Sequence, residues 1–293
     1  MATTHEGITL PTVIRTRGDL RDLLAERRRS GRRIGFVPTM GAFHEGHLSL
    51  MRLAGQGGDH DVVVSLFVNP TQFAPTEDLS KYPRDEERDL RMAAEAGAGI
   101  VFAPPVDEIY PDGFGTTITV SGPTATLEGA SRPDHFSGVA TVVAKLLNIV
   151  SPDRVVFGQK DAQQVAVVRR LIEDLDFDVE LVVGPIVRED DGLAMSSRNA
   201  YLNADERRAA TVLRRALDMA EVLHAGGERH PHVLEAVALA TLEDEPLCEP
   251  EYATIVHPDS FSIIDDPLDG PALLCLAAKV GPARLIDNTT LSV

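Results

Sequence analysis

Two hydrophobic patterns alternate along the first two thirds of the chain. Short runs rich in Val, Ile and Leu have the length of strands, and in several of them the apolar residues are continuous. Continuous runs are typical of parallel strands that are buried on both faces of a sheet. The predicted strands are residues 34–37, 62–68, 100–103, 117–120, 155–157 and 179–183.

Helical periodicity separates most of these runs. The predicted helices are residues 19–29, 46–54, 86–96, 138–150 and 162–175. Strands that alternate with helices imply right-handed βαβ units. The pattern therefore predicts an α/β fold with a Rossmann-like, doubly wound, mostly parallel sheet, and in such sheets ligands bind beyond the carboxyl ends of the strands.

The pattern changes beyond about Val187. One long helix rich in Arg, Glu and Ala is predicted at 204–224 and a second helix at 232–242. Three strand-like runs follow at 252–257, 273–278 and 284–287, with Pro and Gly between them. This order indicates a second, smaller α+β domain with an antiparallel sheet. We therefore expect two domains, residues 1–186 and residues 187–293.

Composition narrows the class of protein. The formal net charge of −17 argues against the basic surface that nucleic-acid binding requires. No apolar run approaches membrane-spanning length, and Cys248 and Cys275 form no C-x-x-C pair, which argues against a zinc site or a disulfide framework. We expect a cytoplasmic enzyme without nucleic-acid or membrane partners.

The most informative segment is PTMGAFHEGH at residues 38–47, between a predicted strand and a predicted helix. Unpaired backbone N–H groups and the helix dipole attract phosphate at such a position. His44 and His47 share one helical face and can both donate to phosphate oxygens, and Gly46 lets a ligand approach the backbone. The alternative is a pair of surface histidines near a helix start.

Two later segments add candidate phosphate donors. Residues 157–164 read FGQKDAQQ and contain Lys160, one of four lysines in the chain. A lysine in a βα loop suits polyphosphate, although the loop could be an ordinary turn with Asp161 as helix cap. Residues 195–199 read MSSRN. The hydroxyls of Ser196 and Ser197 and the guanidinium of Arg198 suit a mobile phosphate clamp, although a turn with a helix cap fits the segment as well.

A small-molecule pocket is predicted at the end of another strand. In SLFVNPTQF, residues 65–73, Asn69 and Gln72 either cap a loop or supply the few placed polar groups of a pocket. Val139, Val142 and Val143 open an apolar helix and suit either core or a pocket wall. The sequence has no Walker A run, no H-E-x-x-H and no G-x-G-x-x-G after a strand, so a nucleotide enzyme of another kind is indicated.

H-x-G-H after the first strand, with a later M-S-x-R, resembles the nucleotidyltransferase and class I aminoacyl-tRNA synthetase superfamily. Within it, residues 37–47, 67–73, 157–161 and 195–199 together resemble the pantothenate synthetase (pantoate–β-alanine ligase) family. The resemblance implies that ATP and pantoate give pantoyl adenylate and pyrophosphate, and that the amine of β-alanine then gives pantothenate and AMP. It also implies Mg²⁺ and a homodimer. The first domain would bind nucleotide and pantoate, and the second would act as a lid.

The resemblance also implies roles for individual residues. The implied catalytic residues are His44, His47 as proton donor, Lys160, Ser196, Ser197 and Arg198. The implied ATP-binding residues are Pro38, Met40, Gly41, His44, Gly46, His47, Gly158, Lys160, Asp161, Val187, Met195, Ser196, Ser197 and Arg198. The implied substrate-binding residues are Met40, Phe67, Asn69, Gln72, Val139, Val142, Val143 and Gln164. Asp89 is the metal candidate, next to Arg88 at a position that is acidic in some relatives.

These residue types suit adenylate chemistry. The nucleophile of the first step is the carboxylate of pantoate, so the protein needs to position the reactants and stabilise negative charge. Family members often have Glu, Tyr and Leu where Gln159, Ala162 and Phe43 stand, and we expect these changes to affect packing. The rivals are an adenylyltransferase for a phosphorylated acceptor and a non-catalytic nucleotide sensor. A tRNA synthetase would need a basic anticodon-binding region, and this chain is too short and too acidic.

Overall fold

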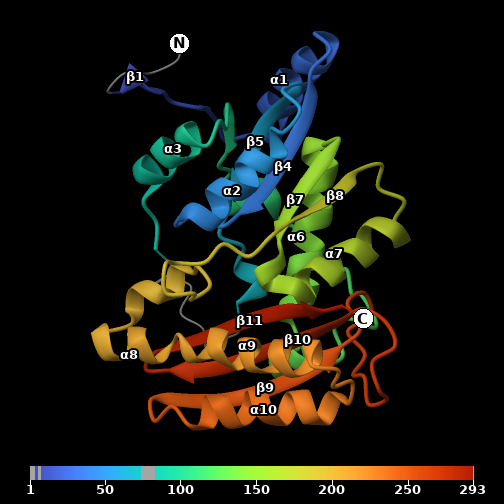
Figure 1. The fold of residues 1–293 in the computed structure, drawn as a ribbon. Coiled ribbons are helices and arrows are strands. Elements are labelled where there is room, and N and C mark those ends of the chain that lie inside the picture. The colour runs from blue at the N-terminus through green and yellow to red at the C-terminus, as the bar shows by residue number, and fades with distance from the viewer. Residues whose placement is uncertain (1–3, 6–7, 74–82, 293) are drawn as a thin grey trace. The chain divides into compact units, whose positions relative to one another are not determined.

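The computed structural model describes residues 4–5, 8–73 and 83–292, which form two compact units (Figure 1). Unit 1 comprises Met1–Val120, Arg132–Gln159 and Val167–Gly184. Unit 2 comprises Ser121–Ser131, Lys160–Ala166 and Pro185–Val293. Two short internal segments of the first expected domain and its last two residues are thus grouped with unit 2, and the functional division at residue 186 stays a prediction.

Unit 1 is built on a six-stranded sheet in the order β3-β6-β5-β4-β7-β8, and every neighbouring pair is parallel. The strands are β3 (Thr12–Ile14), β4 (Arg33–Thr39), β5 (His60–Leu66), β6 (Ile100–Phe102), β7 (Arg154–Gly158) and β8 (Glu180–Gly184). From β4 the chain order runs outward in one direction through β5 and β6, and in the other through β7 and β8. The switch point between β4 and β7 is where doubly wound sheets bind ligands.

Helices cover both faces of this sheet. They are α1 (Arg17–Arg29), α2 (Glu45–Ala54), α3 (Glu86–Glu95), α4 (Val106–Ile109), α6 (His135–Val150) and α7 (Ala162–Asp174), whose first residues belong to unit 2. α2 packs on β4, β5 and β7, whereas α1 and α6 pack on each other and on β4. Gly35 faces α2, and a Cβ there would lie 2.3 Å from the carbonyl oxygen of Ala54. Ile34 and Phe36 point to the opposite face and are fully buried.

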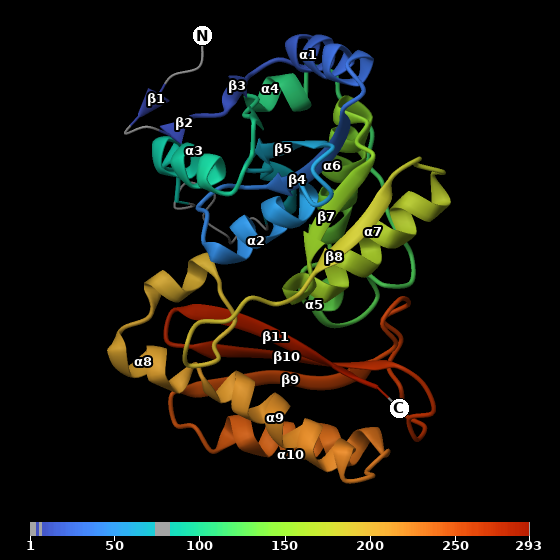
Figure 2. The ribbon, with the colours of Figure 1, turned by 45° about the horizontal axis from the view of Figure 1, so that its top comes forward.

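Unit 2 contains a three-stranded antiparallel sheet in the order β11-β10-β9. Its elements are β9 (Cys248–Val256), β10 (Ala272–Val280), β11 (Ala283–Leu291), α5 (Leu127–Ser131), α8 (Ala204–Ala209), α9 (Val212–Ala225) and α10 (Pro231–Glu243). Figure 2 shows α9 and α10 along one face of the sheet. Leu274 and Leu276 of β10 join the core on that side, while Cys275 packs on the other side against Ala162 and Ala166. Both halves of the predicted fold class are therefore confirmed.

The remaining elements are short. They are β1 (Thr4–His5), β2 (Ile8–Thr9) and the 3₁₀ turns η1 (Pro70–Gln72), η3 (Gln159–Asp161) and η4 (Ser197–Tyr201). The three 3₁₀ turns contain five of the predicted site residues, which are Gln72, Lys160, Asp161, Ser197 and Arg198. The predicted sites thus fall at the ends of regular elements, where the backbone leaves donors for a ligand.

Two sequence-based predictions of secondary structure are wrong. Residues 117–120 form no strand: Thr117 and Thr119 are exposed, and the N–H of Ile118 donates to the hydroxyl of Thr141 in α6 (2.9 Å). The long helix at 204–224 is two helices, α8 and α9. It breaks at Thr211, whose N–H and hydroxyl both donate to the carbonyl of Arg208 (3.3 and 2.8 Å). A threonine hydroxyl competes in this way for helical carbonyls.

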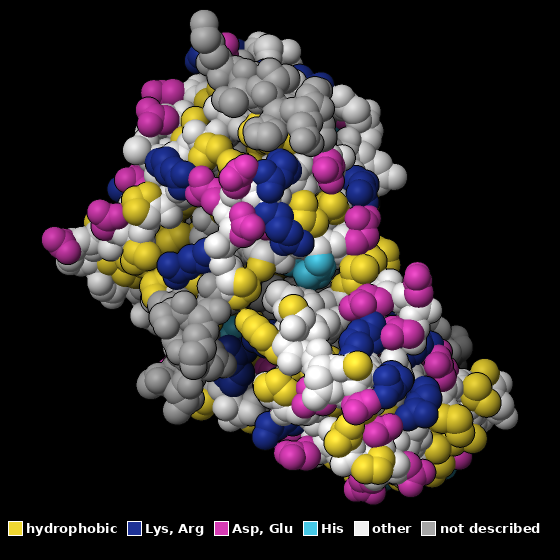
Figure 3. Space-filling model, turned by 90° about the vertical axis from the view of Figure 1, so that its left-hand side faces the viewer, with side chains coloured by type: hydrophobic (Ala, Val, Ile, Leu, Met, Phe, Trp, Pro, Cys, Tyr) yellow, Lys and Arg dark blue, Asp and Glu magenta, His cyan; other side chains and the backbone are white. Residues whose placement is uncertain are grey.

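The charge distribution on the surface and the length of the helices can be compared with what the sequence predicts. On the face drawn in Figure 3, acidic and basic side chains are interspersed and no broad basic area is present among the described residues. Across the described part of the chain, none of the helices combines the length and the apolar character needed to cross a membrane.

Candidate active site

A strained turn joins β4 to α2 and carries the two histidines; we call residues 38–47 the histidine turn. Gly41 and Ala42 have φ values of 91° and 54°, both in the left-handed region. The buried carboxylate of Asp89 in α3 accepts hydrogen bonds from the N–H groups of Ala42 (2.9 Å) and Phe43 (2.8 Å). A Cβ on Gly41 would lie 2.9 Å from Asp89 Oδ2. Glycine and carboxylate together therefore fix the shape of this turn.

The two histidines form a reciprocal cap at the start of α2. His44 is the N-cap, and its Nδ1 accepts from the N–H of Gly46 (3.2 Å). Nδ1 of His47 accepts from the N–H of His44 (3.4 Å), and the ring centroids lie 4.2 Å apart. Because Nδ1 is the acceptor in both rings, the neutral imidazoles carry their proton on Nε2. The prediction that the two histidines lie together is confirmed, and Nε2–H is the donor group of each neutral ring.

Three of the predicted pocket residues are joined by hydrogen bonds in unit 1. The Asn69 amide donates to Gln72 Oε1 (3.1 Å) and to the carbonyl of Gly138 (3.2 Å). Its oxygen accepts from the hydroxyl of Tyr110 (2.8 Å) and from Thr71, while Gln72 Nε2 contacts the sulfur of Met40 (3.0 Å). Both N–H groups and the oxygen of Asn69 are thus engaged within the protein. Asn69 therefore orients Gln72, and the alternative that it caps a loop is also correct.

Sequence reasoning missed Tyr110, which lies 41 positions from Asn69 in the chain. Its ring packs near that of Phe67 at a centroid distance of 6.2 Å. The residues around it carry no recognisable motif, so no signal in the sequence connects it to Asn69. Its contact depends on the tertiary fold.

The predicted apolar wall is buried. Phe67, Val139, Val142 and Val143 are 4%, 2%, 5% and 3% exposed. This is the interior position expected for core residues, and a pocket-lining role for them stays a prediction. Gly158 ends β7, Lys160 follows in η3, and Asp161 directly precedes α7. Gln164 is half-buried in the first turn of α7.

In unit 2, a hairpin precedes the predicted phosphate clamp; we call residues 187–195 the clamp hairpin. The N–H of Met195 donates to the carbonyl of Val187 (2.9 Å), and Arg188 pairs with Ala194 in an antiparallel bridge. The hairpin thus places the predicted ATP-site residues Val187 and Met195 opposite each other. Arg207 forms ion pairs at 2.7 Å with both Glu189 and Asp191 of the hairpin.

The clamp itself begins with a capped turn. Ser196 is the N-cap of η4, and its Oγ accepts from the N–H of Arg198 (3.3 Å). The alternative interpretation of this segment as a turn with a cap is therefore correct for Ser196. Asn199 donates to Glu189 (2.7 Å) and to the carbonyl of Ala194 (3.1 Å), which ties η4 to the clamp hairpin.

Asp89 is the predicted metal candidate, and in the structure its carboxylate supports the histidine turn. Burial raises the pKa of its carboxyl group, while the two N–H donors act in the opposite direction. Both oxygens are engaged by the histidine turn, and the guanidinium of Arg88 is 4.0 Å away. Within the described residues, no group of three His, Cys, Asp or Glu side chains could hold a metal ion. A metal role for Asp89 is untested, and its contacts assign it to the turn.

Comparisons with known proteins identify the family. The profile described as pantoate-beta-alanine ligase matches residues 12–290. A pantothenate synthetase of Thermoanaerobacter sp. strain X514 is 52% identical over 270 residues, which cover 92% of this chain and 95% of that protein. The crystal structure of pantothenate synthetase from Thermus thermophilus has a TM-score of 0.89 at 46% identity, covering 96% of this chain and 100% of that one.

A further structure is the pantoate–β-alanine ligase of Francisella tularensis, complexed with β-γ ATP and β-alanine. It has a TM-score of 0.74 at 31% identity and covers 95% of this chain and 97% of that chain. Family membership favours ligation over both rivals, a nucleotide sensor and an adenylyltransferase for phosphorylated acceptors. The chain therefore belongs to the pantoate–β-alanine ligase family and is an enzyme that joins pantoate to β-alanine.

Proposed function

We propose that this ligase works through a pantoyl adenylate. In the first step, a carboxylate oxygen of pantoate attacks the α-phosphate of ATP, the bond to the β-phosphate breaks, and pyrophosphate leaves. In the second step, the amine of β-alanine attacks the acyl carbon of the adenylate. The acyl–oxygen bond breaks, AMP leaves, the nitrogen loses a proton, and pantothenate is released. Neither step needs a nucleophile from the protein.

The observation that carries this proposal is the geometry of the histidine turn. Its two Nε2–H groups belong to side chains at the N-terminus of α2, where the helix dipole favours phosphate. His47 is proposed as the proton donor and His44 as a second donor to phosphate oxygens. Donors fixed before the reaction stabilise charge on the α-phosphate and on pyrophosphate more than mobile solvent does.

Unit 2 is proposed to supply the remaining donors. Lys160, Ser196, Ser197 and Arg198 would bind the phosphate oxygens of ATP and of the leaving pyrophosphate. The other nucleotide-binding residues are proposed to be Pro38, Met40, Gly41, Gly46, Gly158, Asp161, Val187 and Met195. The complex of the Francisella relative with β-γ ATP and β-alanine supports both substrates for this chain.

The pantoate pocket is proposed on the residues that contact Gln72. Gln72 and Gln164 would bind the hydroxyls and carboxylate of pantoate, and Asn69 would orient Gln72. Met40, Phe67, Val139, Val142 and Val143 would contact the dimethyl end. The hydrogen bonds of Asn69 support an orienting role for it and a binding role for Gln72, because both N–H groups and the oxygen of the Asn69 amide are bonded to protein atoms.

Mg²⁺ is proposed to bind together with ATP, through the triphosphate. The described residues offer no cage of three ligands, which fits an ion held mainly by phosphates and waters. When bound, it would neutralise phosphate charge. The homodimer, the lid role of residues 187–293 and the cytoplasmic location are carried forward as proposals, and the separation into two compact units is compatible with a lid.

Isotope exchange tests the adenylate. With Mg²⁺ and pantoate alone, the enzyme should exchange labelled pyrophosphate into ATP, and β-alanine should be required only for net AMP release. Exchange that strictly requires β-alanine would contradict the intermediate. Other hydroxy acids serve as controls, because exchange with them but not with pantoate would contradict the substrate assignment.

A further inference from the structure

Strand β11 carries two adjacent buried polar residues, Asp287 and Asn288, which are 2% and 4% exposed. Arg188 donates to Asp287 through both terminal nitrogens, at 2.6 and 3.0 Å. Asp287 also accepts from the N–H of Asn288 (2.8 Å). The carboxylate therefore holds a two-pronged ion pair inside unit 2, a geometry with strong directional preference.

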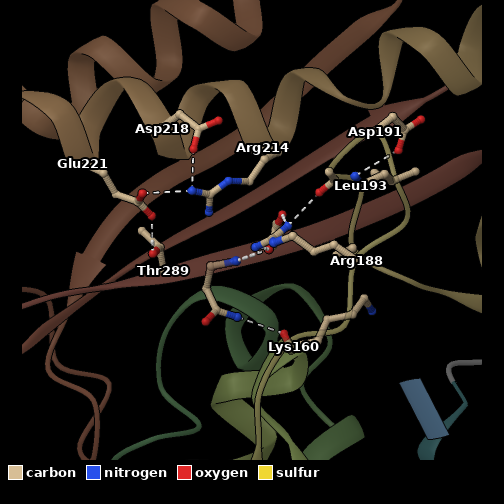
Figure 4. Close-up of polar contacts among 12 residues, drawn as sticks. Lys160, Arg188, Asp191, Leu193, Arg214, Asp218, Glu221 and Thr289 are labelled. Atoms are coloured by element: carbon tan, nitrogen blue, oxygen red, sulfur yellow. Dashed lines mark hydrogen bonds and ion pairs between the residues drawn. The ribbon is translucent and has the colours of Figure 1, made fainter. Parts of the chain in front are cut away.

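The neighbouring side chain reaches Lys160. Asn288 Nδ2 donates to the carbonyl oxygen of Lys160 at 3.1 Å, and a dashed line marks a hydrogen bond at Lys160 in Figure 4. Lys160 lies in the single 3₁₀ turn η3, between β7 and α7. A hydrogen bond to this carbonyl fixes the peptide plane that follows Lys160 and so restricts the backbone from which its ammonium group extends.

Arg188 extends the connection to the clamp hairpin. One of its terminal nitrogens also donates to the carbonyl of Gly192 at the tip of the hairpin (3.0 Å). The hairpin ends at Met195, directly before the proposed donors Ser196, Ser197 and Arg198. Two adjacent residues of one strand thus hold both chain segments that carry the proposed cationic donors of unit 2.

We propose that Asp287 and Asn288 are positioning residues for phosphate binding. Asn288 sets the backbone of Lys160, and Asp287 sets the clamp hairpin through Arg188. This inference rests on the proposed function for its assumption that Lys160 and Arg198 bind phosphate. It requires neither Asp287 nor Asn288 to touch a substrate.

A neighbouring residue provides a matched control. Thr289 follows Asn288 on β11, and its hydroxyl donates to Glu221, which also accepts from Arg214 (2.9 Å). Figure 4 shows this cluster on α9 and β11. Neither of these two bonds reaches Lys160 or Arg188. Thr289→Val therefore removes a polar contact of the same strand without removing a hydrogen bond of either proposed connection.

The test compares Asn288→Ala, Asn288→Asp and Thr289→Val by the overall formation of pantothenate and by pyrophosphate exchange. Asn288→Ala should lower kcat about tenfold or more, as expected when a donor is misplaced, with the KM for pantoate unchanged. Asn288→Asp keeps the size of the side chain but loses the N–H donor, so it should show the same loss. Thr289→Val should keep kcat within about twofold of wild type, while its melting temperature should fall about as much as that of Asn288→Ala.

A double-mutant cycle separates positioning from general destabilisation. In a Lys160→Ala background, Asn288→Ala should cause no further loss of kcat, because residues that act as one unit are not additive. Thr289→Val should have the same small effect in both backgrounds. Asp287→Asn, which weakens the ion pair with Arg188, should raise the KM for ATP as well as lower kcat.

Specific results would overturn the inference. The first is a folded Asn288→Asp variant whose kcat stays within about twofold of wild type. The second is an Asn288→Ala variant that lowers kcat by the same factor with Lys160 and in the Lys160→Ala background. If the wild-type enzyme forms pantothenate but shows no pyrophosphate exchange, the adenylate intermediate is overturned instead. The positioning role would then still be tested by the kcat for pantothenate formation in the variants. A Lys160→Ala variant with wild-type kcat would overturn phosphate binding by Lys160 and with it the positioning role of Asn288, and it would leave the adenylate standing.

Discussion

The histidine turn in unit 1 and the Lys160–clamp assembly in unit 2 are held in different ways. The histidine turn closes on itself through a cap between residues three apart, and Asp89 secures it from 47 positions away. Lys160 and the clamp hairpin depend on β11, whose contacts span 128 and 99 positions. The first region is held by β4, β5, α2 and α3, whereas the second needs the completed antiparallel sheet. The proposed phosphate donors of unit 2 should therefore be more sensitive to distant substitutions.

The two anchoring carboxylates differ in chemistry as well as in sequence distance. Asp89 accepts two neutral backbone N–H groups, and burial raises its pKa. Asp287 accepts the guanidinium of Arg188 and one backbone N–H. Removing the carboxylate of Asp287 leaves a half-buried cation without its ion-pair partner, which should cost more than leaving two neutral N–H groups without an acceptor.

The largest expected effect is that of Lys160→Ala. If the ammonium group stabilises charge only in the transition state, adenylation should fall by about two to three powers of ten, each equal to ~1.4 kcal/mol. Folding should be retained, since the residue's hydrogen bond with β11 is made by its backbone. Lys279→Ala is the control, because that lysine is 52% exposed and pairs with Glu249. A loss below about tenfold in pyrophosphate exchange would remove Lys160 from the proposed machinery.

Asp89→Ala tests the anchor of unit 1. Two N–H donors of a strained turn lose their acceptor, so we expect about 1–3 kcal/mol less stability in urea unfolding. Exchange should slow about tenfold because His44 and His47 are displaced. His47→Ala should slow exchange even at saturating pantoate.

A magnesium titration decides between the two roles of Asp89. If the residue holds the turn, excess Mg²⁺ will not restore exchange in Asp89→Ala. Recovery at high Mg²⁺ together with unchanged stability would show that the residue is a metal ligand after all. Asp85→Ala is a suitable control, because Asp85 is exposed and its carboxylate caps α3 by accepting from the N–H of Arg88.

A smaller effect is expected at the pantoate pocket. Tyr110→Phe removes the hydroxyl that donates to Asn69, so Gln72 becomes less restricted. A lost hydrogen bond of about 1 kcal/mol corresponds to a KM for pantoate raised about fivefold, with kcat little changed. Gln72→Ala should raise this KM further. An unchanged KM in Tyr110→Phe, with KM raised in Gln72→Ala, would show that Gln72 needs no support from Asn69.

The contrast between the two regions also explains how far the sequence could be interpreted. The strands of unit 1 and the two histidines follow from local patterns, because apolar runs and helix caps are encoded by neighbouring residues. The clamp segment was found for the same reason. Asp287, Asn288 and Tyr110 were missed, since each acts on a residue at least 41 positions away. For Asp89, the family resemblance suggested a metal ligand, and the contact of both its oxygens with the histidine turn depends on the tertiary fold.

Both thiols lie in unit 2, and their titration is expected to change stability rather than catalysis. Burial raises the pKa of Cys248 to about 11 and that of Cys275 to about 12, from 9.0. The folded state therefore keeps both thiols protonated. Their contribution to stability is complete below about pH 9 and is lost as the pH rises toward about 11 and 12, by at most about 1.4 kcal/mol per pH unit for each thiol. Urea unfolding at about pH 8 and about pH 10.5 measures this slope.

The labelling rate of Cys275 measures the stability of strand β11, because Cys275 lies opposite Asn288 in the register of β10 and β11. Only the thiolate reacts with iodoacetamide, so at about pH 8 the native thiols should react at least about a hundredfold more slowly than those of the unfolded chain. ATP and pantoate should slow the labelling of Cys275 several-fold further, since a ligand bound at Lys160 stabilises the sheet that holds it. Asn288→Ala should abolish this protection, and Thr289→Val should leave it in place. Ligand protection that survives in Asn288→Ala would show that Lys160 and β11 are not coupled, and the contrast between the two regions would then be one of sequence distance alone.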